Sequence, residues 1–195
     1  MLKAKRREWV FLAIVVVAWL FVLNKSVDMS FVDQDIKMVI SQNKSGLRTL
    51  DDPRDIVSTK ELYKKRLEFF DGSILRDSEY GKLGYRSNFF IDFDVDLEIL
   101  KSAEYLFRIS SDDGFRLFID GSMLCEFVTD RPVESDVCSI YLTKGTHVFR
   151  LNYFQGAGNL GLRAELKAAD QDEYALVGED SDYVEYRRGG GEEVE

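Results

Sequence analysis

The sequence predicts an all-β protein, an antiparallel β-sandwich preceded by a single N-terminal transmembrane helix. Two observations predict the sandwich. Apolar and polar residues alternate in several short runs, which is the pattern of half-buried strands. Glycine- and aspartate-bearing turns separate these runs, as in sandwiches and barrels. A third observation predicts the helix, because residues 9–23 contain no charged side chain and follow a basic start.

The N-terminal segment predicts an uncleaved membrane anchor. Residues 1–8 form a basic tip that should stay cytoplasmic, and residues 9–26 form the spanning signal anchor. A cleaved signal peptide is the competing interpretation, but no small-x-small cleavage pattern follows the apolar run. We therefore expect a single-pass membrane protein whose C-terminal domain is periplasmic or extracellular.

Residues 27–60 predict a juxtamembrane stalk. The spacing of Phe31, Ile36, Val39 and Ile40 is loosely helical, and polar, glycine- and proline-containing stretches follow. The pattern indicates a short helix and a tether rather than part of the sandwich.

Residues 61–168 contain the predicted strands, beginning with a strand and turn at 67–72. The clearest alternation places Asp92, Asp94 and Asp96 on the solvent face of a strand over residues 89–97. Their spacing also suits an alternating calcium loop, but no glycine turn interrupts the strand, which favours a solvated face. Further strands are predicted at residues 105–109, 115–119, 147–153 and 160–166.

The turn between two of these strands carries the adjacent carboxylates of Asp112 and Asp113, followed by Gly114. Carboxylate oxygens on a loop suit a hard cation such as calcium. A polar hairpin turn without a ligand is the simpler interpretation of the pattern alone.

The motif Tyr-x-Phe-x-x-Ser-Ser-Asp-Asp-Gly-x-x-Leu-x-Ile-Asp-Gly over residues 105–121 resembles the core of the protective-antigen domain family, a group of β-sandwich modules. Four other segments resemble landmarks of the family in the same order; they are residues 87–97, 140–147, 151–155 and 160–166. The resemblance covers residues 62–168. It implies a carbohydrate-binding or adhesin-type sandwich.

The resemblance also implies a site. In sugar-binding members, two consecutive aspartates joined by a cis peptide bind calcium, and the calcium holds sugar hydroxyls. Asp112 and Asp113 match these aspartates. A second loop completes the family site, and here Asn159 is its natural side-chain ligand. The candidate metal ligands are thus Asp112, Asp113 and Asn159, and the candidate ligand-binding residues are Gly114, Gln155, Gly158 and Asn159. A glycine-rich hairpin with Asn159 in a left-handed turn is the structural alternative.

Cys125 and Cys138 enclose 12 residues, and an oxidising compartment would permit a disulfide between them. Two unpaired buried thiols are the alternative. A zinc site is disfavoured because the sequence has one histidine, His147, and no Cys-x-x-Cys. We expect His147 to be structural, because no nucleophile or carboxylate spacing assigns it a catalytic partner.

The exported part is acidic, since removing residues 1–8 leaves 22 Lys and Arg against 34 Asp and Glu. This balance disfavours nucleic acid or an anionic membrane surface as a partner. Residues 169–195 predict an acidic flexible tail. We expect a non-catalytic module for calcium-assisted glycan binding or adhesion. The alternative is a structural or protein-interaction subunit of a cell-envelope complex.

Overall fold

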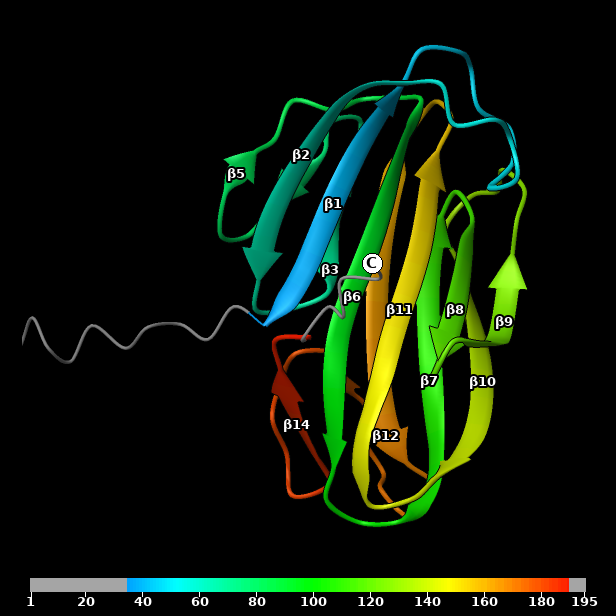
Figure 1. Cartoon of the computed structure of the whole chain (residues 1–195). Helices are drawn as coiled ribbons and strands as arrows, with labels where there is room; N and C mark the ends of the chain where they lie inside the picture. Colours follow the sequence, from blue (N-terminus) through cyan, green and yellow to red (C-terminus); the bar gives the residue numbers. More distant parts are fainter. Residues whose placement is uncertain (1–34, 190–195) are drawn as a thin grey trace, which may run out of the picture. The chain divides into compact units, whose positions relative to one another are not determined.

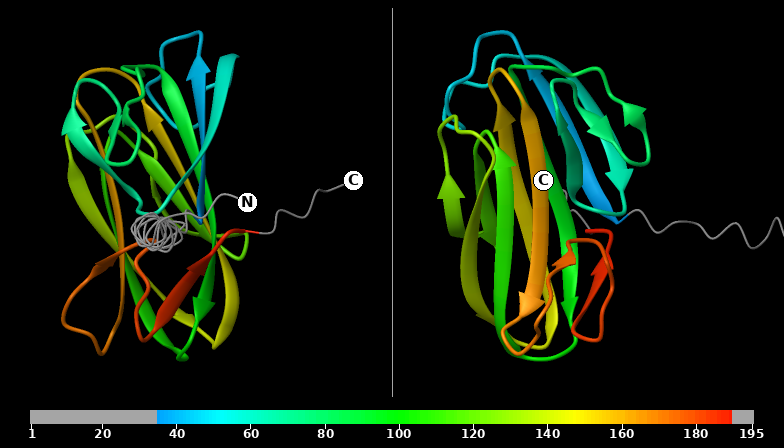
Figure 2. Two further views of the ribbon diagram at one scale, coloured as in Figure 1. Left: turned by 90° about the vertical axis from the view of Figure 1, so that its left-hand side faces the viewer. Right: turned by 180° about the vertical axis from the view of Figure 1, so that it is seen from behind.

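The computed structural model describes residues 35–189, and within that range it is an all-β sandwich of two facing antiparallel sheets (Figure 1, Figure 2). The predicted fold class is confirmed. The predicted transmembrane helix lies outside the described residues. Among residues 35–189, no helix is long and apolar enough to cross a bilayer.

The larger sheet has the strand order β2-β1-β6-β11-β8-β9, with β14 also paired to β6. The smaller sheet has the order β10-β7-β12-β13, with β3 also paired to β12, and β4 and β5 form a separate hairpin. The strands are β1 (Ile36–Asn43), β2 (Ile56–Lys64), β3 (Glu68–Gly72), β4 (Arg76–Asp77), β5 (Gly81–Lys82), β6 (Phe89–Ile99), β7 (Ala103–Asp112), β8 (Phe115–Ile119), β9 (Ser122–Phe127), β10 (Glu134–Leu142), β11 (Gly145–Gln155), β12 (Leu160–Ala168), β13 (Ala175–Leu176) and β14 (Val184–Arg187).

The core lies between the two sheets and consists of the inward residue of each alternating pair. Aromatic rings from opposite sheets meet there, as shown by Phe107 on β7 and Phe149 on β11, whose centroids lie 5.9 Å apart. Phe69 on β3 contacts Phe93 on β6 in the same way, at 5.8 Å. Such tilted ring pairs add packing energy beyond the area they bury. They contribute to the packing between the two sheets.

The stalk prediction for residues 27–60 is wrong where the structure describes it. Residues 36–43 form β1, which lies between β2 and β6 within the larger sheet. Ile36, Met38 and Ile40 are fully buried, which is the period of a strand rather than a helix. The sandwich therefore begins well before residue 61.

The tail prediction for residues 169–195 is also wrong over its described part. Val177 is fully buried and contacts the core, as do Val184 and Tyr186 of β14. β14 pairs with the end of β6 that β1 leaves free, so β1 and β14 lie end to end along β6. Scattered apolar residues within the acidic sequence thus complete the core.

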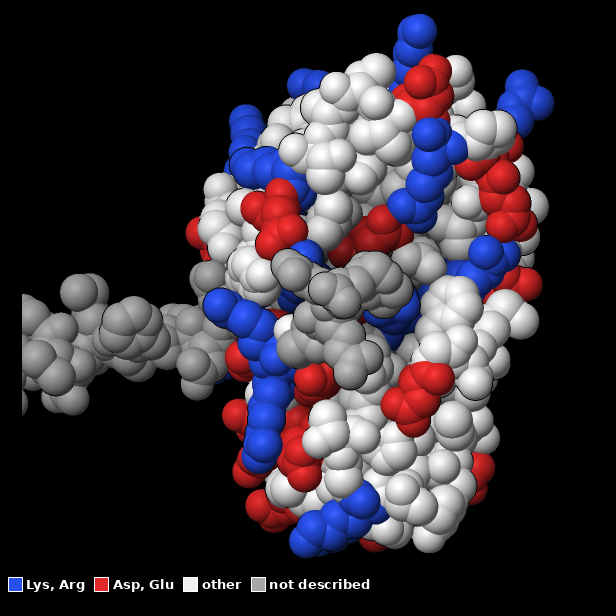
Figure 3. Space-filling model, in the orientation of Figure 1, with Lys and Arg blue, Asp and Glu red and all other residues white. Residues whose placement is uncertain are grey.

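The acidic face of β6 is compensated by basic side chains. Asp92 accepts two hydrogen bonds from Arg54, and Asp94 forms an ion pair with Arg150 at 2.9 Å. Acidic and basic side chains intermingle over this face of the larger sheet (Figure 3). This agrees with a solvated strand face rather than a calcium loop.

Candidate functional site

Strand register brings the two predicted site loops together. Asp112 ends β7 directly opposite Gly161 of β12, and Phe115 of β8 lies opposite Tyr153 of β11. The Asp112–Gly114 turn and the loop from Gln155 to Leu160 therefore meet at the same end of the sandwich. Figure 1 shows β11 running upward to this end. The sequence motifs alone do not supply this register.

The peptide bond between Asp112 and Asp113 is cis, as the family resemblance implies. Asp113 is only 4% exposed, and its Oδ2 accepts a hydrogen bond of 2.7 Å from the backbone N–H of Gly156. The hydroxyl of Tyr153 contacts the carbonyl oxygen of Asp112. The first loop is thus fixed by contacts from β11 and the second loop.

Gln155 has a positioning role rather than the ligand contact predicted for it. Its side chain is fully buried, with Oε1 accepting a 2.6 Å hydrogen bond from Tyr153 and Nε2 donating to the Asn159 carbonyl oxygen at 2.7 Å. Gly158 has a φ of 99°, which favours glycine, and allows the loop to turn back. The exposed side chain of Asn159 is left at the rim of the site.

A third loop, residues 128–133, closes the site, and its contribution to the site was not predicted from the sequence. It lies inside the ring closed by the Cys125–Cys138 disulfide, whose Cα atoms are 6.3 Å apart. The predicted disulfide is therefore present. An added Cβ at Gly114 would lie 2.4 Å from the Phe127 carbonyl oxygen and 3.1 Å from that of Thr129. The loop packs so closely on the Asp-Asp-Gly turn that only glycine fits there.

Arg131 anchors this third loop. Its side chain is buried, stacks 4.1 Å from the centre of the Phe127 ring and donates a 3.0 Å hydrogen bond to Ser111 Oγ. It also forms a 2.6 Å ion pair with Asp136. A dipeptide of opposite charges, Asp130-Arg131, between two cysteines was the available sequence signal. It could not be assigned to the site without the tertiary contacts.

The three loops surround an open pocket of about 380 Å³. It is lined by Asp112, Asp113, Asp130, Arg131, Pro132, Ala157 and Asn159. Of the predicted metal ligands, Asp112 and Asp113 come from the first loop and Asn159 comes from the second loop. Gly114 is buried beneath the pocket, and Gln155 lies inside the protein.

The donor set of this pocket suits a hard cation. The carboxylates of Asp112 and Asp113 and the amide oxygen of Asn159 are oxygen ligands of the kind that calcium prefers. Within residues 35–189, no group of three or more His, Cys, Asp or Glu side chains is placed to hold a metal ion. Backbone carbonyls, water or ligand hydroxyls would therefore have to complete a calcium shell of six to eight oxygens.

Burial raises the pKa of Asp113 above its ordinary value, because the charged carboxylate loses water contact. Hydrogen bonds from the backbone N–H groups of Gly156 and Arg131 oppose this rise, and the nearby charge of Asp130 adds to it. A bound cation would stabilise the ionised form. The Asp113 carboxyl group is therefore easier to protonate than that of an ordinary aspartate.

His147 lies outside this pocket and has structural partners. Its Nδ1 lies 2.7 Å from Asp120 Oδ2, and its Nε2 lies 2.8 Å from the Thr143 carbonyl oxygen. Burial alone would lower the pKa of His147. The hydrogen bonds to these two acceptors raise it by more, so the pKa of His147 lies above its ordinary value. His147 therefore links the start of β11 to Asp120, which follows β8, and to Thr143 in the turn before β11.

A family sequence model, the PA14 domain, matches residues 71–179, which is more than half of the chain. The chain belongs to the PA14 domain family. One structural neighbour is the PA14 domain of the antifreeze protein MpAFP, with a TM-score of 0.62 and 14% identity over 79% of this chain and 90% of that one.

Two other structural neighbours are adhesin domains. The PA14 sugar-binding domain from an RTX adhesin has a TM-score of 0.59 and 16% identity, over 73% of this chain and 94% of that one. The A domain of epithelial adhesin 9 from Candida glabrata, in complex with Galβ1-4GlcNAc, has a TM-score of 0.59 and 11% identity, over 80% and 91%. At these identities the neighbours establish the fold alone. No functionally curated protein matches the chain.

Proposed function

We propose that this PA14 domain is a non-catalytic module for calcium-assisted glycan binding, held at a membrane by residues 9–26. The observation that carries the proposal is the convergence of Asp112, Asp113 and Asn159 on one open pocket. The likeness to the sugar-binding domain of an RTX adhesin and to an adhesin domain in complex with Galβ1-4GlcNAc supports the glycan part. The basic tip and uncharged run at the N-terminus support the membrane part.

Each pocket residue has a definable task. Asp112, Asp113 and Asn159 would hold calcium, which would supply coordination positions for ligand hydroxyls. Asp130 presents an exposed carboxylate that can accept hydrogen bonds from further hydroxyls. Pro132 and Ala157 offer small apolar contacts to a sugar ring. The disulfide-closed third loop would keep these contacts in place.

Calcium titration calorimetry on the full-length chain in detergent tests the proposal. We expect saturable binding by the wild type, with a Kd in the range of about 10⁻⁴ to 10⁻³ M that is usual for extracellular calcium modules. D112N and D113N should each weaken binding by at least about tenfold, because each removes one charged ligand. D172N, which removes an exposed carboxylate that does not line the pocket, is the matched control.

The outcomes separate the two halves of the proposal. A folded wild type that binds no calcium at millimolar concentration would exclude the calcium-assisted mechanism. Calcium binding without any hit on a glycan array would instead favour the second candidate, a protein-interaction subunit of a cell-envelope complex. The pocket lining favours this second candidate in one respect, because it contains no aromatic side chain to stack on a sugar ring.

Calcium affinity should fall as the pH is lowered. The raised pKa of Asp113 means that protons compete with calcium at a higher pH than for an ordinary aspartate, whose pKa is about 3.9. Affinity should be constant at neutral pH and decline as the pH falls toward and through the raised pKa. Calorimetry at a series of pH values should show proton release on binding in the declining range. A pH-independent affinity down to about pH 4 would contradict this assignment.

A further inference from the structure

Lys64 and Asp77 form a fully buried ion pair. Neither residue lines the pocket described above. Lys64 is the last residue of β2, and Asp77 belongs to the β4–β5 hairpin. Neither side chain has any solvent exposure. Lys64 Nζ donates a hydrogen bond to Asp77 Oδ2. Lys64 also lies opposite Ile36, the first residue of β1, where the described chain enters the larger sheet.

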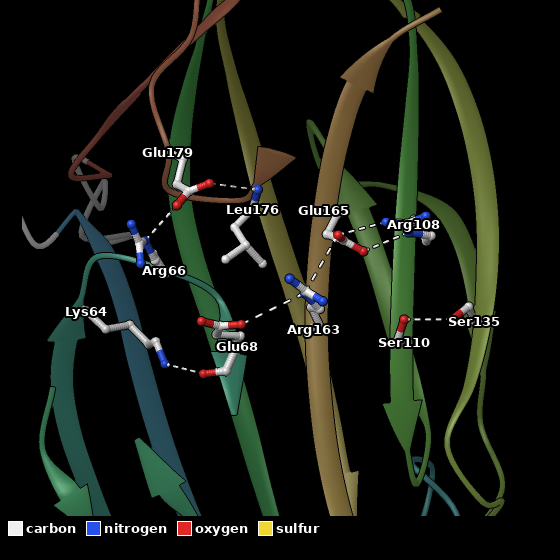
Figure 4. A network of polar contacts seen from close by, with 10 residues as sticks. All are labelled: Lys64, Arg66, Glu68, Arg108, Ser110, Ser135, Arg163, Glu165, Leu176 and Glu179. Carbon is white, nitrogen blue, oxygen red and sulfur yellow. Dashed lines mark hydrogen bonds and ion pairs between the residues drawn. The ribbon is translucent and has the colours of Figure 1, made fainter. Parts of the chain in front are cut away.

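The surroundings of the pair are hydrogen-bonded on one side and apolar on the other. Lys64 Nζ donates a second hydrogen bond of 3.0 Å to the Glu68 carbonyl oxygen (Figure 4). The Phe69 ring lies against the amine, with its centre 4.4 Å from Nζ. Asp77 Oδ1 accepts hydrogen bonds from the backbone N–H groups of Glu79, at 2.8 Å, and Tyr80, at 3.2 Å.

An ion pair in this place is costly. Removing both charges from water carries a large desolvation penalty that their attraction does not reliably offset. Burial lowers the pKa of the Lys64 amine, although the Asp77 carboxylate opposes this. Transfer of one proton from Lys64 to Asp77 gives a neutral amine beside a neutral carboxylic acid. A neutral amine is a nucleophile, and the two N–H donors at Oδ1 are placed to stabilise an oxyanion on that atom.

We propose that Lys64 and Asp77 condense to an intramolecular amide, an isopeptide bond that joins β2 to the β4–β5 hairpin. The bond between Lys64 Nζ and Asp77 Cγ forms, and the bond between Cγ and Oδ2 breaks. Two of the three protons of the ammonium group pass to Oδ2, which leaves as water. The third stays on the amide nitrogen. The step is a dehydration of the ion pair and requires no oxidant, reductant or co-reactant.

The existing cradle satisfies every polar atom of the product. The amide N–H inherits the hydrogen bond to the Glu68 carbonyl oxygen. The amide oxygen, which is the former Oδ1, keeps the hydrogen bonds from the N–H groups of Glu79 and Tyr80. The product buries no charge. The same contacts therefore accommodate the amide without the desolvation penalty of the ion pair.

Mass spectrometry of the full-length chain, purified in detergent and with its disulfide reduced, tests the proposal directly. We expect the wild type to be lighter than its sequence mass by one water molecule. K64Q should have its full sequence mass, and K82Q, which changes an exposed lysine on β5, should keep the deficit. After tryptic digestion, residues 61–65 and 77–82 should be recovered as one branched species, because trypsin cannot cleave after an acylated Lys64.

Both masses are read on denatured protein, so the result does not depend on whether K64Q folds. A folded wild type at full sequence mass, with cleavage after Lys64, would show that the pair is an ordinary buried ion pair. A water deficit that K64Q retains would place the dehydration elsewhere and would also refute the proposal. Neither result depends on calcium or glycan binding.

Discussion

Replacing Gly178 with alanine is expected to unfold a large fraction of the molecule or to lower its melting temperature sharply. An added Cβ would lie 1.7 Å from the Lys65 carbonyl oxygen, which is backbone and cannot rotate away. The φ of 103° at this position adds strain for any residue with a side chain. Overlap and strain together should cost about 3 kcal/mol or more of the free energy of unfolding.

Thermal unfolding followed by circular dichroism would measure this effect, and a shift of about 6 °C or more is expected for a domain of this size. G46A is the matched control, because its added Cβ would meet only Asn88 Oδ1 at 3.9 Å and its φ is not positive. A G178A variant as stable as the wild type would contradict the packing of residues 175–187 on the core. Such a result would instead favour the flexible tail that the sequence predicts for residues 169–195.

Replacing Gly114 with alanine should damage the pocket more than any single change to its rim. The added Cβ would lie 2.4 Å from the Phe127 carbonyl oxygen and 2.7 Å from Phe154 Cε1. Relief of this overlap requires the Asp-Asp-Gly turn and the third loop to move apart. We expect a loss of about 1–3 kcal/mol of stability from overpacking. Calcium affinity, where the wild type shows it, should fall by more than tenfold, because Asp112 and Asp113 move with the turn.

Calorimetry and thermal unfolding of G114A should be compared with those of G161A. The control glycine lies in β12 beside the same pocket, but its added Cβ would make only an ordinary contact of 3.6 Å with Val133 Cγ2. G161A should therefore retain both stability and calcium binding. If G114A and G161A behave alike, the third loop does not press on the turn and does not form a wall of the site.

The sequence predicted the central part of the fold well, because its strands repeat strongly with a period of two. Phe89, Ile91 and Phe93 on β6 are fully buried as expected. The two ends were predicted wrongly for different reasons. In β1, apolar residues occur close enough together to suit a helix or a strand, and only pairing with β2 and β6 decides between them. In β14, few apolar residues stand among many charges, so the local composition resembles that of a disordered segment.

The features of the site also differ in whether the sequence could predict them. The sequence predicts Asp112, Asp113 and Asn159 as site residues because they lie within motifs of short range, and the structure places all three in the lining of one pocket. Burial of Gln155 and the wall formed by Asp130, Arg131 and Pro132 were not found, because both depend on contacts between segments distant in the chain. The disulfide prediction identified the ring that contains the third loop but not where the loop lies.

The sequence by itself determined the sandwich fold, the family and the Asp112-Asp113 turn, because alternation, motif order and residue type are local properties, whereas it left the Cys125–Cys138 disulfide as one of two alternatives. Only the tertiary structure decided that β1 and β14 share one side of β6, that three loops form the pocket and that Lys64 is buried against Asp77. The physical reason is that strand register and burial depend on the packing of the whole chain. A residue's environment is therefore not encoded in its neighbours along the sequence alone.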